Sequence, residues 1–138
     1  MATHTTNYRA TFIEVAEDCP TDHATEPPAG DPPTIAALQY RLIAEEPYAH
    51  TSDDVVFAVH ALRRGMDPDD SAAREEFFSK GQPCLRSSPL GKRYGWGILS
   101  DEQGRVALVA RESQTYAALA ADPALGHTRA MRSRRAPR

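Results

Sequence analysis

One short segment of the chain combines a thiol, hydroxyls, cations and aromatic rings. Between Phe77 and Gly97 the sequence reads FFSKGQPCLRSSPLGKRYGWG. A guanidinium can hold a carboxylate or phosphate through two hydrogen bonds, and nearby hydroxyls can satisfy the remaining acceptor sites. The segment therefore predicts a pocket for an anionic small molecule, with the following ligand-binding residues: Arg86, Ser87, Ser88, Lys92, Arg93, Tyr94 and Trp96.

Each of these residue types has an expected role in such a pocket. The three cations would fix the anionic group, the two serines would donate hydrogen bonds to it, and the Trp96 indole would pack on its apolar part. A carboxylate from Glu14, Glu17 or Asp18 would complete the pocket. The alternative is that these cations are simply solvated or paired with the acidic first half of the chain.

The same segment holds a candidate nucleophile, Cys84. A neighbouring Arg or Lys would stabilise its thiolate, but covalent catalysis also needs an oriented base. We expect His60 to act as that base if the fold brings it beside Cys84. The alternative is that Cys84 is a small buried hydrophobe and His60 a boundary residue. The sequence thus predicts either an enzyme with Cys/His-based or cofactor-independent chemistry, or a ligand-binding protein.

Metal and nucleotide motifs are missing. The acidic stretch from Glu14 to Asp22 includes Cys19, but its spacing matches no zinc pattern, and neither CxxC nor HExxH occurs. The GK pair in PLGKRYGWG lacks the earlier glycine of a phosphate-binding loop and precedes a predicted strand. We therefore predict no metal and no cofactor.

Charge is distributed very unevenly along the chain. Residues 1–76 hold 15 acidic and 5 basic side chains (net −10), whereas residues 77–138 hold 4 and 11 (net +7). The two halves are expected to attract each other, or the basic half faces an anion. Two further hypotheses stay open: a nucleic-acid- or protein-binding module that uses the basic C-terminal half, and a homodimer that joins unlike halves.

Length and composition favour a single cytoplasmic domain. A chain of 138 residues with 41% hydrophobic and 25% charged residues is typical of one globular domain. We find no signal peptide and no apolar run long enough for a bilayer, so no membrane partner is expected. Two cysteines cannot form a disulfide framework, although a single Cys19–Cys84 bridge stays open.

The first half of the chain predicts one strand and three helices. Alternating β-formers predict a strand over residues 9–16, and five prolines make residues 17–33 an irregular loop. A helix is expected from Pro33 or Thr34 to before Pro47, and a second one from the TSDD cap at residues 51–54 to Gly65. A short helix follows within residues 69–81, with Phe77 and Phe78 in the core.

The second half predicts a hairpin and a last helix. Residues 82–92 form a loop, and residues 94–99 and 105–111 form an antiparallel hairpin. Gly95 and Gly97 weaken a strand unless something approaches its backbone, which makes this strand a candidate floor for a ligand. A helix over residues 113–121 and an edge strand over residues 127–131 complete the pattern.

This order of elements predicts an α+β fold in a single domain. We expect a small antiparallel sheet of three or four strands with about four helices packed on it. The domain would span residues 9–131, between a flexible N-terminus (1–8) and a basic, disordered tail (132–138).

Several long segments resemble a known family. TFIEVAEDCP, LQYRLIAEEPY, TSDDVVFAVHA, EFFSKGQPCLRSSPLGKRYGWGI and RAMRSRR together cover most of the chain. In these segments the sequence resembles a small family of bacterial proteins catalogued as a domain of unknown function. The resemblance implies a single bacterial domain and points to the same central segment, but it implies no activity or substrate.

Overall fold

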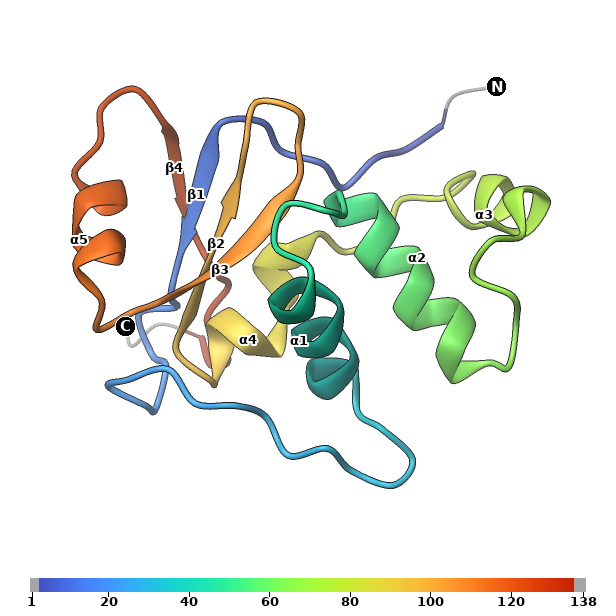
Figure 1. Ribbon diagram of the computed structural model, residues 1–138, viewed down its shortest axis with the longest axis horizontal. Coiled ribbons are helices and arrows are strands. Elements are labelled where there is room, and N and C mark those ends of the chain that lie inside the picture. Colours follow the sequence, from blue (N-terminus) through green and yellow to red (C-terminus); the bar gives the residue numbers. More distant parts are fainter. Residues whose placement is uncertain (1–2, 136–138) are drawn as a thin grey trace.

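Strand β1 (Thr11–Glu14) lies in the interior of a four-stranded sheet, and the other elements are arranged around it (Figure 1). The computed structural model describes residues 3–135. After β1 the elements follow in this order: α1 (Ile35–Glu45), α2 (Ser52–Arg63), α3 (Ser71–Phe77), the 3₁₀ helix η1 (Leu85–Ser87), α4 (Pro89–Lys92), β2 (Trp96–Ser100), β3 (Val106–Ala110), α5 (Gln114–Ala120) and β4 (Gly126–Arg129).

The sheet is mixed, with the strand order β3-β2-β1-β4. The predicted hairpin is present, since β2 and β3 pair antiparallel, and β1 pairs antiparallel with β2. The edge strand β4 instead runs parallel to β1, because the chain crosses over through α5 before it reaches the far edge. The predicted α+β class with a small sheet is confirmed, and the expectation of a wholly antiparallel sheet is corrected at β4.

Helices cover both faces of this sheet (Figure 1). Residues that alternate along a strand point to opposite faces. On one face Ile13 and Ile98 belong to the main core, together with Leu38 of α1 and Val55 of α2. On the other face the ring of Phe12 meets the ring of Tyr116 from α5 edge to face, with centroids 5.0 Å apart.

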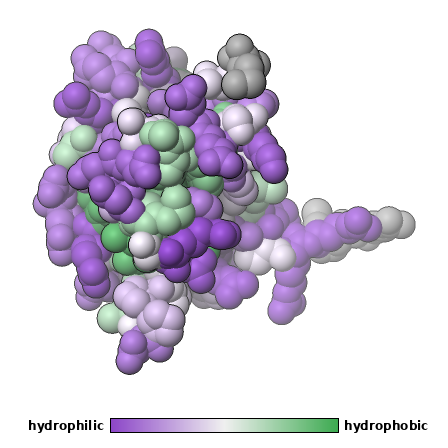
Figure 2. All heavy atoms as spheres, turned by 90° about the vertical axis from the view of Figure 1, so that its right-hand side faces the viewer, coloured by the Kyte–Doolittle hydropathy of each residue, from purple (hydrophilic) through white to green (hydrophobic). Residues whose placement is uncertain are grey.

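A second, smaller core lies under α3. Phe57, Ala61 and Phe78 form it, with Phe77 packed against it, so the predicted core position of the two adjacent phenylalanines is confirmed. Figure 2 views the molecule from this side and shows an apolar area surrounded by hydrophilic side chains.

The starts of the first three helices are determined by local caps. The Thr34 Oγ1 accepts a hydrogen bond from the Ala37 backbone N–H at 3.1 Å. Thr51 and Asp54 form a reciprocal capping box, in which each side chain accepts from the other residue's backbone N–H. Asp70 caps α3. All three positions agree with the predicted helix starts.

The segment predicted as a loop over residues 82–92 contains η1 and α4. Leu85 and Leu90 are almost completely buried, at 2% and 0% exposure, and fix this segment to the core. Ser88 caps α4 by accepting from the Leu90 N–H at 3.1 Å, and Pro89 occupies the first helical position. The prediction was wrong because a four-residue helix shows no apolar periodicity that could reveal it.

Gly97 in strand β2 and Gly95, just before this strand, are both approached closely by other parts of the protein. A Cβ atom at Gly97 would lie 2.8 Å from ring atoms of both Phe12 and Tyr116. A Cβ atom at Gly95, which has φ +78°, would lie 2.8 Å from the His23 backbone oxygen. The interpretation of this strand as the floor of a ligand pocket is therefore corrected, because its own neighbours fill the space.

Both ends of the described chain contact the domain. Near the N-terminus, Thr6 is buried against α2 through the Asp53 carboxylate. Near the C-terminus, the backbone N–H groups of Ser133 and Arg134 donate to the Asp18 carboxylate. The predicted flexible and disordered ends also include residues 1–2 and 136–138, which lie outside the described residues. No helix within residues 3–135 is long and apolar enough to cross a membrane.

Candidate functional site

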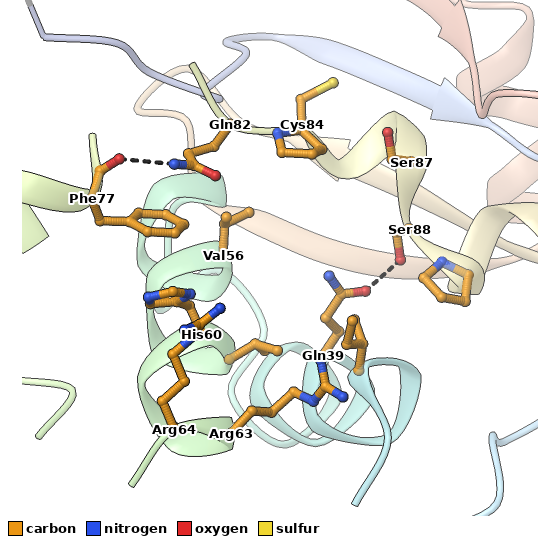
Figure 3. A pocket seen from close by; sticks show the side chains of 14 residues that line it. Gln39, Val56, His60, Arg63, Arg64, Phe77, Gln82, Cys84, Ser87 and Ser88 are labelled. Atoms are coloured by element: carbon orange, nitrogen blue, oxygen red, sulfur yellow. Dashed lines mark hydrogen bonds between the residues drawn. The ribbon is translucent and has the colours of Figure 1, made fainter. Parts of the chain in front are cut away.

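A hollow of about 380 Å³ lies between α1, the C-terminal half of α2 and residues 82–89 (Figure 3). We call it the α1–α2 hollow. Its volume is within the range of small-molecule sites. Its apolar wall includes Val56, Val59 and Phe77, whereas its polar groups come from Gln39, His60, Arg63 and Arg64.

The side-chain amide of Gln39 points into this hollow (Figure 3). Gln39 is only 7% exposed, and its Oε1 accepts a hydrogen bond from Ser88 Oγ at 2.6 Å. Because Ser88 Oγ in turn accepts from the Leu90 N–H, this chain of hydrogen bonds fixes the orientation of the amide. Gln39 Nε2 donates to no other residue within 3–135, and no fully buried side-chain N or O atom of the described residues lacks a partner, so this nitrogen is open to solvent from the hollow.

Two guanidinium groups reach the rim of the hollow from the end of α2. Arg63 and Arg64 are exposed, and neither forms an ion pair with another described residue. None of the described side chains that line the hollow is acidic. The unbalanced cations make this a region of positive potential next to an apolar wall.

His60 lies on the wall of the hollow, with its ring tilted by 39° against that of Phe77 at a centroid distance of 4.4 Å. Burial, and to a lesser extent the charge of Arg64, lowers the pKa of His60 below its ordinary value. The imidazole is therefore neutral at pH 7 and can exchange hydrogen bonds with a ligand without adding charge.

The lowered pKa of His60 gives a testable pH dependence. The unfolded chain binds a proton at His60 before the folded protein does, so the free energy of unfolding should decrease as the pH falls below about 6.5. A bound anion should raise the pKa of His60, because negative charge favours the imidazolium. NMR titration of the His60 ring with and without octanoate measures both values. A free-protein pKa at or above 6.5 would contradict this account.

Cys84 and His60 line the same hollow but do not form a pair. The Cys84 sulfur turns away from the imidazole (Figure 3) and lies 3.6 Å from the Tyr8 hydroxyl. The hydrogen bond with Cys84, together with burial, raises the pKa of Tyr8, so the phenol stays protonated at neutral pH and cannot serve as a base. The expected arrangement of a thiol beside an imidazole is thus not present. Cys19 and Cys84 are both free thiols.

The predicted ligand-binding residues are divided between two hollows. Ser87 and Ser88 line the α1–α2 hollow, although the Ser88 hydroxyl is already occupied by Gln39 and by the α4 cap. Lys92, Arg93 and Tyr94 line a neighbouring hollow of about 400 Å³, to which Ser87 also contributes. The central segment therefore contributes hydroxyls to the α1–α2 hollow and cations to the neighbouring one, instead of bringing them together in a single pocket.

Three predicted residues line neither of these hollows. Arg86 turns toward β4 and donates through Nε to the Arg129 backbone oxygen at 2.7 Å. The Trp96 indole N–H donates to the Thr25 backbone oxygen at 2.8 Å. Glu14 lies 3.9 Å from the Arg129 guanidinium across β1 and β4. Their expected convergence with Lys92 is not observed, because each is engaged with another part of the domain.

Sequence reasoning missed three residues that the structure brings to the α1–α2 hollow. Gln39 follows Ile35 by four residues, which places a polar side chain on the apolar stripe of the predicted helix, and this was an available signal. Arg63 and Arg64 resemble the basic residues that often end a helix, so nothing local distinguished them. Within residues 3–135 no group of three or more His, Cys, Asp or Glu side chains is placed to hold a metal.

The geometry defines a single-domain α+β protein with a cation-rimmed hollow beside its sheet. The chain belongs to a family of unknown function, DUF6157, whose family model matches residues 3–136. The resemblance to an uncharacterised family is thus confirmed. Searches of curated proteins and of solved structures each found no match.

Proposed function

We propose that the protein binds a small molecule with an anionic group and an apolar body in the α1–α2 hollow. The observation that carries this proposal is the Gln39 amide, which Ser88 orients so that its Nε2 faces the hollow, where it donates to no other described residue. Because Ser88 holds this amide in place and its N–H groups are open to the hollow, a ligand oxygen can replace water as their acceptor.

Charge and shape support the same class of ligand. Arg63 and Arg64 provide planar guanidinium groups suited to a carboxylate or phosphate, and no acid lines the α1–α2 hollow, although Arg64 also borders a hollow lined by Glu76. The wall formed by Val56, Val59 and Phe77 would shelter an apolar chain or ring from water. Catalysis by Cys84 or His60 stays a prediction outside this proposal, since the two groups face apart.

The proposal is tested by calorimetric titration with octanoate, phenylacetate and the neutral analogue 1-octanol. The anions should bind, and octanol should bind at least about tenfold more weakly, because one charge-assisted hydrogen bond is worth roughly that factor. The double substitution Arg63→Gln with Arg64→Gln should weaken octanoate binding by about tenfold or more.

A matched control is available in Arg41→Gln with Arg105→Gln. These two arginines are exposed and line neither hollow, so the control variant should bind octanoate like the original protein. Failure of both anions to bind, equal binding of octanol, or equal losses in the two double variants would each overturn the proposal.

The second hypothesis, a nucleic-acid- or protein-binding module, has less support. Two arginines of the basic half are paired with acids of the first half, Arg129 with Glu14 and Arg132 with Glu17 at 3.0 Å. Such pairing lowers the charge available to phosphates. Salt-sensitive binding to random DNA would favour this hypothesis, and salt-dependent dimerisation would favour a homodimer. A cytoplasmic location is part of our proposal, and the free thiols of Cys19 and Cys84 support it.

A further inference from the structure

A second hollow adjoins the α1–α2 hollow at the start of α1. It has a volume of about 400 Å³, and we call it the α1-start hollow. Four residues line both hollows: Ile35, Arg63, Ser87 and Pro89. Because the two hollows share these walls, we infer that they form one continuous trough.

The α1-start hollow has its own cations. Lys92 and Arg93 line it together with the shared Arg63, and none of its described lining residues is acidic. None of these three cations forms an ion pair within residues 3–135. Arg93 also borders a hollow that contains Asp18, but the Asp18 oxygens accept backbone N–H groups from Ser133 and Arg134.

The junction between the two hollows combines apolar and cationic groups. Ile35 and Pro89 provide apolar contacts there, and Arg63 faces both sides. The first turn of α1 adds the positive end of its dipole to the effect of the side chains at the α1-start hollow. The trough thus has Arg64 toward one end, Lys92 and Arg93 toward the other, and Ile35 and Pro89 beside Arg63 and Ser87 at the junction.

We propose that the ligand carries two anionic groups joined by an apolar linker. One group would accept from Gln39 and the arginines of the α1–α2 hollow, and the other would lie against Lys92 and Arg93. Each group is a carboxylate or a phosphate, since both chemistries suit guanidinium and ammonium donors. This inference rests on the proposed function and specifies the ligand class for the same site.

The test compares diacids with monoacids of equal chain length by calorimetric titration. Adipate is compared with hexanoate, suberate with octanoate, and sebacate with decanoate. We expect the tightest diacid to bind about tenfold more strongly than its monoacid, as one added charge-assisted contact would give. The substitution Lys92→Gln with Arg93→Gln should remove this advantage and leave monoacid binding unchanged.

The outcomes separate this inference from the function on which it rests. If monoacids bind and no diacid binds more tightly, the second anionic group is refuted and the proposed function stands. If neither series binds, the proposed function itself fails. An equal loss of monoacid and diacid binding in the Lys92 and Arg93 variant would also overturn the inference. Thermal unfolding verifies that this variant folds, and Lys92→Gln alone is used if the pair does not.

A phosphonate in place of one carboxylate distinguishes the two anion chemistries. If the phosphonate form of the tightest diacid binds more strongly, and the gain is lost with Lys92→Gln, the second group is phosphate-like. If the diacid binds more strongly than its phosphonate form, the second anionic group is a carboxylate. Either result supports a ligand with two anionic groups. Equal affinity for the diacid, its phosphonate form and the monoacid would refute such a ligand.

Discussion

Gly97→Ala should destabilise the protein by about 3 kcal/mol, the upper part of the range for adding a methyl group to a packed core. The new Cβ atom would lie 2.8 Å from ring atoms of both Phe12 and Tyr116. Neither ring can move easily, since Phe12 is fully buried and the Tyr116 hydroxyl accepts from the Val15 N–H at 2.9 Å. Urea denaturation measures the loss.

Gly81→Ala is the matched control for this prediction. A Cβ atom at Gly81 would meet only His4 Nδ1, at an ordinary contact distance of 3.8 Å, so this variant should retain nearly the original stability. A change of less than about 0.5 kcal/mol in the free energy of unfolding is typical of a neutral surface substitution. Such a small change in Gly97→Ala would contradict the packing of α5 on β2.

Asp53→Ala should cost about 3 kcal/mol and release the N-terminal segment. The Asp53 carboxylate is 9% exposed and accepts three hydrogen bonds, from Thr5 Oγ1, Thr6 Oγ1 and the Thr6 backbone N–H, at 2.6 to 2.7 Å. Its removal leaves the buried Thr6 backbone N–H without this acceptor, which costs about 1–3 kcal/mol, and the Thr6 hydroxyl keeps only its hydrogen bond with Ser52 Oγ at 2.8 Å.

Two measurements check the Asp53 prediction. Urea denaturation gives the loss of stability, and hydrogen exchange at the Thr6 amide should become fast in the variant. Glu75→Ala, on the exposed surface of α3, is the control and should leave both unchanged. A protected Thr6 amide in Asp53→Ala would show that other contacts hold the segment.

The parts of the fold that local chemistry specifies were predictable. The capping box at Thr51 and Asp54 and the turn between β2 and β3 each depend on residues close in sequence. The direction of β4 was not predictable, because Gly126–Arg129 is a short strand with three of its four residues exposed. Its pairing depends on the crossover through α5, which no local signal determines.

The candidate site was predictable only in part, for a similar reason. The central segment supplies Ser87, Ser88 and Lys92 to the hollows, as its composition indicated. Leu85, at the start of η1, is buried in the core, and Arg86 lies toward β4, away from the hollows. The decisive donor, Gln39, comes from a helix 49 residues away from its partner Ser88, so only the fold could bring them together.

The most direct test of anion binding is the NMR signal of the Gln39 side-chain amide during titration with octanoate. We expect the Nε2 proton resonances to move downfield as a carboxylate accepts from this group, and to move much less with 1-octanol at the same concentration, because octanol binds more weakly and its hydroxyl is a weaker acceptor. Unchanged Gln39 resonances under saturating octanoate, with shifts confined to surface arginines elsewhere, would contradict anion binding in the α1–α2 hollow.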